Sequence, residues 1–290
     1  MIKNQVDCIV RFHDINRINE LNRCIFSLVG QKHRPLHIIV VAQRFTDSQI
    51  TDTRDMLKPL LSIPNPPTLT LKNWEHAQPV DARTELLNIG LAAATGQYVA
   101  FLDYDDVLYP EAYSVLTERL KLSGKAIAFA SVRVVNASVF PEFLHIAGLK
   151  DAPFAGSNLN DLFRANFCPI HSFLIDRSIV SPNILSFDTS ITWEEDYDLL
   201  LKICASYPSD FTEVKKTIGD YYFKNDGSNT IPMNGILSKK HTVEYERVKA
   251  FIENRKKTTF VATEVQKQLG LRNISSGMTI SDALAALKAN

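Results

Sequence analysis

Two kinds of apolar spacing alternate along the first part of the chain. Short continuous apolar runs are typical of buried strands, and segments with apolar residues three or four positions apart are typical of helices. Gly and Pro residues close several of these segments. Such βαβ order predicts a mainly parallel sheet with helices on both faces. The strand-like runs span 6–12, 36–42, 69–71 and 98–102, and the helical segments span about 18–28, 46–63 and 86–93.

The regular alternation ends after Gly124. Residues 126–135 predict one long strand, and the proline-punctuated sequence after it predicts irregular structure that shapes a substrate pocket. Helical spacing returns at 193–205 and again from about residue 238. We therefore expect an α/β domain followed by a C-terminal helical extension. The expected boundaries are 1–237 for the domain, with halves 1–124 and 125–237, and 238–290 for the extension.

Composition narrows the class of protein. The 290 residues include 32 Lys and Arg against 32 Asp and Glu, so the chain lacks the basic surplus of a nucleic-acid binder, and we expect no nucleic-acid partner. The four cysteines stand singly, without CxxC spacing, and predict buried, reduced thiols in a cytoplasmic protein. No apolar stretch approaches the roughly 20 residues that span a bilayer. Peripheral attachment to a membrane stays open.

The stretch VAFLDYDDVLYP, residues 99–110, holds the first candidate chemistry. It delivers three aspartates at the C-terminal end of a predicted strand, where α/β proteins bind ligands. Asp103 and Asp105 can share a divalent cation, Mg²⁺ or Mn²⁺, which would neutralise a bound diphosphate. The competing interpretation is that these acids cap the helix expected near Pro110. Spacing alone does not separate the two.

The acidic residues also allow other interpretations. DYDDVL resembles the nucleophile loop of haloacid dehalogenase-like phosphatases, in which Asp103 would be phosphorylated, although that loop usually follows an early strand. Glu194, Glu195 and Asp196 occupy a first helical turn, where the helix dipole alone favours acids. The seven histidines lack metal-ligand spacing, and no GxGxxG or GxxxxGK[ST] motif occurs. Nicotinamide enzymes and P-loop NTPases are therefore disfavoured.

Three segments in order carry a more specific pattern. They are LNRCIFSLVGQKHRPLHIIVV (21–41), ARTELLNIGLAAATGQYVAFLDYDDVLYP (82–110) and EEDYDLLLKI (194–203). Together they resemble glycosyltransferase family 2, whose members are inverting enzymes of the GT-A fold, a Rossmann-like mixed sheet. The resemblance implies a nucleotide-binding half over 1–124 and an acceptor-side half over 125–237. It covers the chain from about Val6 to Ser228.

The resemblance also implies site residues. One sugar would move from a nucleotide-sugar donor to an acceptor hydroxyl, with Asp196 as the general base and a divalent cation on the diphosphate. The first-turn position of Asp196 predicts a lowered pKa for this carboxyl. The residues expected to bind donor are Arg11, Phe12, Gln43, Arg83, Asp103 and Tyr104; those expected to bind metal are Asp105 and Asp103; Glu195 and Asp226 are accessory.

Departures from the family pattern qualify these expectations. Gln43 stands where an acid usually reads the nucleobase, so the donor base is open. YYFKNDGSNT (221–230) lacks the family's histidine, and Asn225 or Asp226 would have to supply that contact. Without a QxxRW motif or a membrane span, we expect one sugar added per encounter, by analogy in lipopolysaccharide or capsule assembly on a glycan or lipid-linked acceptor. The basic cluster Arg255–Lys257 is compatible with a lipid-linked acceptor. A catalytically silent sugar-nucleotide or glycan-binding module is the alternative.

Overall fold

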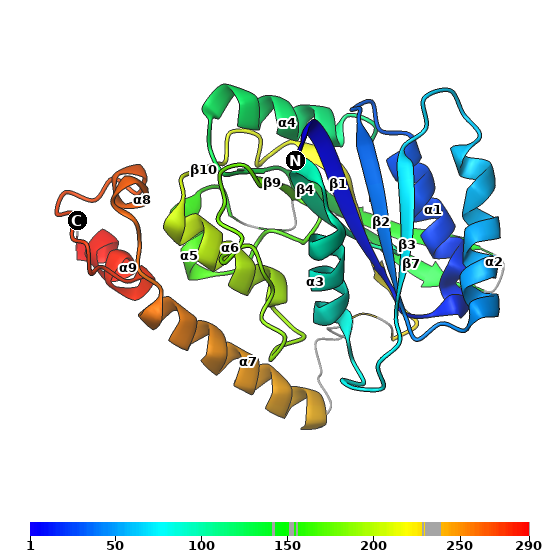
Figure 1. The fold of residues 1–290 in the computed structure, drawn as a ribbon. Coiled ribbons are helices and arrows are strands. Elements are labelled where there is room, and N and C mark those ends of the chain that lie inside the picture. The colour runs from blue at the N-terminus through cyan, green and yellow to red at the C-terminus, as the bar shows by residue number, and fades with distance from the viewer. Residues whose placement is uncertain (141–142, 151–153, 155, 228, 230–238, 290) are drawn as a thin grey trace.

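A seven-stranded sheet forms the centre of the computed structural model, which describes residues 1–290 except 141–142, 151–153, 155, 228, 230–238 and 290 (Figure 1). Its strands are β1 (Ile2–Phe12), β2 (Leu36–Gln43), β3 (Thr68–Trp74), β4 (Gly96–Asp103), β6 (Ile127–Phe129), β9 (Phe173–Asp176) and β10 (Ser209–Asp210). Their order is β10-β6-β9-β4-β1-β2-β3. Strand β9 runs antiparallel to both of its neighbours, and the other pairs are parallel. The predicted mixed, mainly parallel sheet is confirmed.

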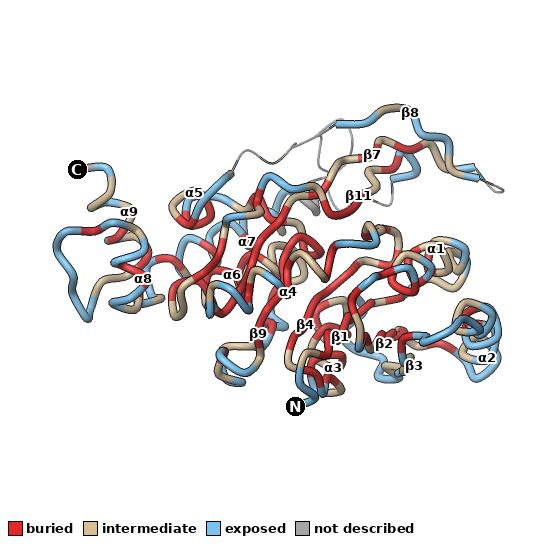
Figure 2. The backbone as a smooth tube through the Cα atoms, turned by 90° about the horizontal axis from the view of Figure 1, so that it is seen from above, coloured by how far each residue is buried: buried red, intermediate tan, exposed pale blue. Residues whose placement is uncertain are grey.

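Helices cover both faces of this sheet because successive strand residues point to opposite sides. On β1, Cys8 and Val10 face one core with α1 (Ile18–Val29) and α4 (Ala112–Ser123). Ile9 faces the other core with α3 (Arg83–Ala93) and α6 (Glu195–Ser206). Buried positions form continuous stretches along the central strands (Figure 2). Helix α2 (Asp47–Leu57), with a capping box at Thr46, and the 3₁₀ segments η1 (Ile15–Arg17) and η2 (Lys58–Leu61) complete the first half.

A second, four-stranded sheet lies beside one face of the first (Figure 2). Its order is β5-β11-β7-β8, from β5 (Val107–Leu108), β11 (Thr217–Lys224), β7 (Ser131–Val139) and β8 (Leu144–Lys150). The single strand predicted over 126–135 is wrong. The chain changes partners at its middle, where Ala130 N–H donates to Ser172 and Ser131 N–H donates to Lys216. It therefore forms β6 in the first sheet and β7 in the second.

The C-terminal helices pack on the α/β domain. They are α7 (Lys239–Thr258), α8 (Thr263–Gln268) and α9 (Ile280–Ala289), and they lie against α6 and α5 (Leu159–Arg164). Val248 and Ile252 of α7 join the same buried cluster as α6, so this side of α7 is a packing surface. The boundary expected at 237/238 lies outside the described residues.

The basic cluster of α7 holds this helix in place. Arg255 donates to Asp198 at 2.5 Å and to Asp188 at 3.2 Å, and Lys256 donates to the Arg164 carbonyl at 3.0 Å. Two of the three cations therefore pair within the protein, and the compatibility of this cluster with a lipid-linked acceptor stays a prediction. All four cysteines are buried and free, as predicted. Among the helices described, none has the length and apolarity to cross a bilayer.

Candidate active site

Arg11 lies where β1 and β4 end side by side. The parallel register sets Arg11 opposite Asp103. The Arg11 guanidinium donates to both Asp103 oxygens, from Nε to Oδ1 at 2.6 Å and from Nη2 to Oδ2 at 3.1 Å. Its Nη1 donates to Glu195 Oε1 at 2.6 Å. One side chain thus joins the aspartate loop to the first turn of α6, 92 residues further along the chain.

Charge pairing sets the ionisation of Asp103. Burial opposes the charged carboxylate, but the charge and hydrogen bonds of Arg11 outweigh it and lower the pKa of Asp103. Glu195 and Asp103 in turn raise the pKa of Arg11 well above its ordinary value. Asp103 is therefore a fixed anion at the end of β4.

Asp196 has different surroundings. Asp196 Oδ1 accepts from Asn166 Nδ2 at 3.3 Å and from the Tyr197 N–H at 2.7 Å. Burial, then the charges of Glu195 and Glu194, raise the pKa of Asp196 well above the usual range for a carboxyl. The expectation of a lowered pKa is wrong, because these two effects exceed the contribution of the helix N-terminus. The Asp196 side chain is still partly exposed.

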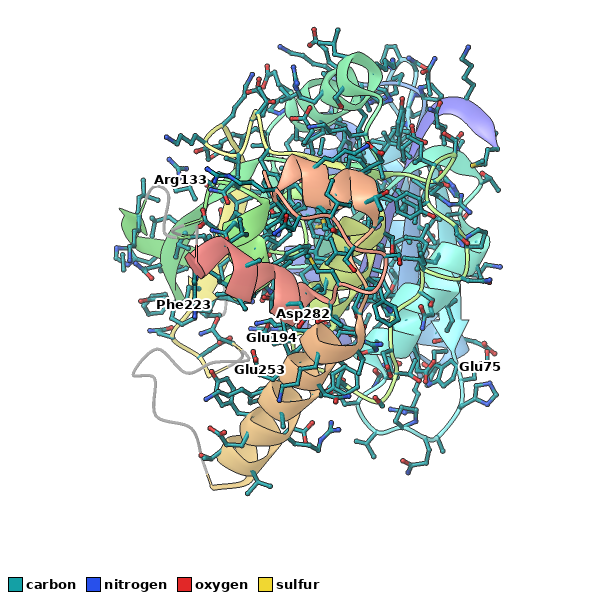
Figure 3. All side chains as sticks on the ribbon, turned by 90° about the vertical axis from the view of Figure 1, so that its left-hand side faces the viewer. Glu75, Arg133, Glu194, Phe223, Glu253 and Asp282 are labelled. Carbon is teal, nitrogen blue, oxygen red and sulfur yellow. The ribbon has the colours of Figure 1, made fainter. Side chains whose placement is uncertain are left out.

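The residue before α6 aims the chain into this turn. Glu194 has a left-handed backbone, with φ of 56°, which is uncommon for a residue with a side chain. Its Oε2 accepts from the same Asn166 amide at 3.3 Å. Figure 3 looks at the molecule from the side of α7 and α9, with Glu194 labelled. Asn166, which sequence reasoning missed, therefore contacts both acids.

Asp105 contacts a buried lysine. Lys224, the last residue of β11, donates from Nζ to Asp105 Oδ2 and to Glu20 Oε2, both at 2.6 Å. Its side chain is 1% exposed. Arg23 of α1 donates to the Asp105 carbonyl at 2.7 Å and stacks over Tyr222 at 4.1 Å. Sequence reasoning missed Lys224 and Glu20, and no local signal marked them.

Asp106 is the most deeply buried acid of the loop. Its Oδ1 accepts from Tyr222 N–H at 2.7 Å, and its Oδ2 lies 3.5 Å from His171 Nδ1. Burial and the charges of Asp105 and Asp103 raise the pKa of Asp106 well above its ordinary value. Burial lowers the pKa of His171 to about 4. His171 is therefore neutral near pH 7, and the bond that Asp106 accepts from Tyr222 ties the loop to the second sheet.

The remaining donor-side residues occupy varied surroundings. Gln43 is held in the loop, donating to the Val80 carbonyl at 3.1 Å and accepting from Ala82 N–H at 3.2 Å. Arg83 begins α3 and pairs with Asp81 at 2.9 Å. The Phe12 ring is fully buried against Tyr104, at 5.2 Å between centroids. The Tyr104 hydroxyl accepts from Arg17 at 3.3 Å. The two rings are thus part of the core beneath the loop.

The segment expected to supply a further metal contact points elsewhere. Asn225 accepts from Val139 N–H at 3.1 Å and donates to Ser138 at 3.2 Å, so its side chain is bound to β7. Asp226 forms an ion pair with Arg17. Lys224, at the end of β11, donates to the Asp105 carboxylate of the loop at 2.6 Å.

The donor set does not fit a divalent cation as it stands. Both Asp103 oxygens accept from Arg11, and Asp105 Oδ2 accepts from Lys224. Mg²⁺ and Ca²⁺ require about six oxygen ligands or retained waters. Within the described parts of the chain, no three His, Cys, Asp or Glu side chains are grouped to hold a metal ion.

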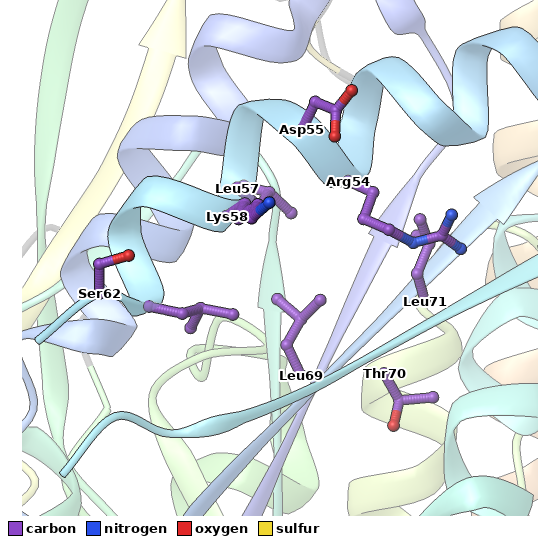
Figure 4. Close-up of a pocket in the computed structure, with 9 residues that line it drawn as sticks. Arg54, Asp55, Leu57, Lys58, Ser62, Leu69, Thr70 and Leu71 are labelled. Carbon is purple, nitrogen blue, oxygen red and sulfur yellow. The ribbon is translucent and has the colours of Figure 1, made fainter.

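A hollow of about 810 Å³ lies elsewhere, between α2, η2 and β3 (Figure 4). It is lined by Arg54, Asp55, Leu69 and their neighbours, at the β3 edge of the large sheet. None of the predicted site residues lines it. The chemistry therefore concentrates at the ends of β1 and β4, where Arg11 and Asp103 meet.

Comparison with known proteins assigns the family. Residues 15–181, more than half of the chain, match Glycosyl transferase family 2, and the chain belongs to this family. It is 27% identical over 202 residues to the succinoglycan biosynthesis protein ExoO of Rhizobium meliloti (strain 1021), covering 66% of this chain and 53% of ExoO. It is 32% identical over 101 residues to the uncharacterized glycosyltransferase YibD of Escherichia coli (strain K12), covering 35% of this chain and 26% of YibD. The chain thus spans about half or less of these relatives.

Solved structures support the GT-A fold. A crystal structure of S. aureus TarS 1-349 in complex with UDP-GlcNAc aligns with TM-score 0.59 at 14% identity, covering 91% of this chain and 70% of that one. The mannosyltransferase PcManGT from Pyrobaculum calidifontis, in complex with GDP-Man and Mn²⁺, aligns with TM-score 0.54 at 14% identity, covering 98% and 74%. The predicted GT-A fold with C-terminal helices is confirmed.

Proposed function

We propose that this protein is an inverting glycosyltransferase that moves one sugar from a nucleotide-sugar donor to an acceptor hydroxyl. The donor diphosphate binds near the Asp103–Asp106 loop, and Asp196 acts on the acceptor. The observation that carries this proposal is the Arg11 bridge, which joins Asp103 and Glu195 through bonds of 2.6 Å each. It brings a fixed anion of the donor loop beside the helix turn that holds Asp196.

Glycosyl transfer requires Asp103 and Asp196 to differ in their affinity for a proton. The acceptor oxygen attacks the anomeric carbon, its proton passes to Asp196, and the bond from that carbon to the diphosphate oxygen breaks, so that a nucleoside diphosphate leaves. A raised pKa makes the Asp196 carboxylate a stronger proton acceptor. The described carboxylates offer no ready-made divalent cation site, so no step of this mechanism passes through the metal that the sequence predicts.

The alternatives differ in what they require of Asp103. A phosphatase needs a free nucleophilic oxygen, but both Asp103 oxygens accept from Arg11. The family assignment also favours a transferase. A silent binding module would share the fold, and it would give no reason to raise the pKa of a partly exposed acid beside the donor loop.

The acceptor and the cellular setting are proposed from the relatives of this chain. The relationship to ExoO, named for succinoglycan biosynthesis, supports a role in assembling a bacterial surface glycan. We propose a saccharide acceptor, free or lipid-linked, and action on the cytoplasmic side of the membrane, including peripheral attachment. This setting rests on analogy with relatives.

A donor screen followed by turnover tests the proposal. UDP, GDP, dTDP and CDP are titrated by calorimetry, and the sugar nucleotides of the base that binds are then incubated with candidate saccharide acceptors. We expect one base to bind and its diphosphate to be released in wild type but not in Asp196→Asn. Binding without release in any acceptor pool, unchanged in Asp196→Asn, would support the binding module instead.

A further inference from the structure

Lys224 lies at an unusual place for a lysine. Its side chain is 1% exposed, although lysine is among the residues least often buried. Its ammonium bonds to two carboxylates from different elements, Asp105 of the donor loop and Glu20 of α1. A buried charge persists only when it is paired and hydrogen-bonded. The fold therefore dedicates a compact cation to the Asp105 carboxylate.

The second sheet explains how Lys224 arrives there. The aspartate loop continues into β5, which pairs antiparallel with the start of β11 at Leu108 and Gly219. A Cβ on Gly219 would come within 2.4 Å of the Val107 carbonyl oxygen, so only glycine allows this close approach. Strand β11 then runs on to Lys224, while β7 holds its other edge.

Other cations and anions extend the pairing. Arg17 pairs with Glu20 at 3.1 Å and with Asp226, and Arg11 pairs with Asp103 and Glu195. Each acid of this network therefore has a cation from the chain itself. A divalent cation at Asp105 Oδ2 would meet the Lys224 ammonium 2.6 Å from that oxygen, and like charges so close repel strongly.

We infer that Lys224 is a built-in cation that takes the place of a divalent metal ion at Asp105, so that the protein binds a nucleoside diphosphate without a metal. This rests on the proposed function, because it concerns the same donor site. Lys224 holds Asp105 neutralised and in place, which makes it a positioning residue. The Lys224 ammonium then supplies at Asp105 the positive charge that a bound ion would otherwise supply.

The first test compares wild type in excess EDTA with wild type in excess MgCl₂ or MnCl₂. UDP, GDP, dTDP and CDP are titrated by calorimetry under both conditions. We expect the dissociation constant of the diphosphate that binds to change less than about threefold. Binding that appears only with metal would overturn the inference and leave the proposed function standing. Failure of every diphosphate, with or without metal, would overturn both.

A lysine variant sharpens the test. In Lys224→Met, Asp105 and Glu20 face the same vacated space, and two carboxylates can hold a hard cation. We expect diphosphate binding in EDTA to weaken at least about tenfold and to recover with MnCl₂. We also expect MnCl₂ alone to raise the Tm of this variant and not that of wild type. A merely structural lysine would not create this response to metal.

Lys215→Met is the matched control, because Lys215 is an exposed lysine that lies two residues before β11 begins. It should behave as wild type in both titrations. Diphosphate binding by Lys224→Met that equals wild type in EDTA would overturn the role of Lys224. If Lys224→Met does not fold, the metal dependence of wild type still decides the inference.

Discussion

Each of the two acidic clusters of the site contains an aspartate, and the surroundings shift the pKa values of these two aspartates in opposite directions. In the donor loop, Asp103 and Asp105 contact Arg11 and Lys224, and the pKa of Asp103 is lowered. In the first turn of α6, Asp196 accepts from the Asn166 amide and the Tyr197 N–H, and burial and the charges of Glu195 and Glu194 raise its pKa. In the proposed function, the first cluster binds the donor and the second accepts a proton.

The largest effect should come from removing the proton acceptor. Asp196→Asn keeps the shape and the Asn166 contact but cannot take a proton. We expect nucleoside diphosphate release with acceptor to fall by about 10³-fold, within the range for general-base catalysis. The exposed Asp52→Asn on α2 is the control and should keep full activity. A loss below about tenfold would mean that Asp196 is not the base.

Removing the bridge between the clusters should cost stability. Arg11→Met leaves Asp103 and Glu195 without their shared cation, and such unpaired, largely buried acids are costly. We expect the free energy of unfolding in urea to fall by about 3 kcal/mol. Arg54→Met, at an exposed position on α2, should change it little. Equal losses in the two variants would contradict the bridge.

Two substitutions within the donor loop compare an acid whose pKa is lowered with one whose pKa is raised. Asp103→Asn removes a charged partner of Arg11 and should lower the free energy of unfolding by about 2 kcal/mol at pH 7. Asp106→Asn keeps an acceptor for Tyr222 N–H, and because the pKa of Asp106 is raised it should cost less than about 1 kcal/mol. Urea unfolding measures both. A larger loss of unfolding free energy in Asp106→Asn than in Asp103→Asn would contradict the opposite pKa shifts assigned to these two acids.

Turnover, which depends on Asp196, and diphosphate binding, which depends on Asp103, should also respond differently to pH. This effect should be smaller than the preceding ones. Asp196 must be ionised to act, so kcat/KM should rise with pH through an apparent pKa above the ordinary value of about 4. The stabilisation from the lowered pKa of Asp103 is present above its unfolded pKa and lost as pH falls through its folded pKa. Diphosphate binding should therefore persist below the pH at which turnover fails. Parallel loss of binding and turnover would contradict this.

Much of the architecture follows from local pattern. Strands β1, β2 and β4 and helices α1, α3 and α6 match their predicted segments, because apolar periodicity records which face each element buries. The split of 126–135 could not be predicted, because Ala130 and Ser131 change partners through bonds to distant segments. Sequence pattern does not report such long-range pairing.

The site divides in the same way. Asp103 and Asp196 stand out through their place at a strand end and in a first helical turn. The sequence does not mark Lys224 as the partner of Asp105, because Lys224 reaches Asp105 only through the register of β11 with β5 and β7. The predicted direction of the pKa shift of Asp196 is also wrong. A helix N-terminus contributes only about 0.3–1 kcal/mol, and burial beside two acids exceeds this contribution.

The most direct test of the division between the clusters is a pair of calorimetric titrations. The nucleoside diphosphate that binds wild type is titrated into Asp196→Asn and into Asp103→Asn. The account predicts a dissociation constant within about twofold of wild type for Asp196→Asn and weakened at least about tenfold for Asp103→Asn. Equal weakening in both variants, or weakening confined to Asp196→Asn, would contradict it.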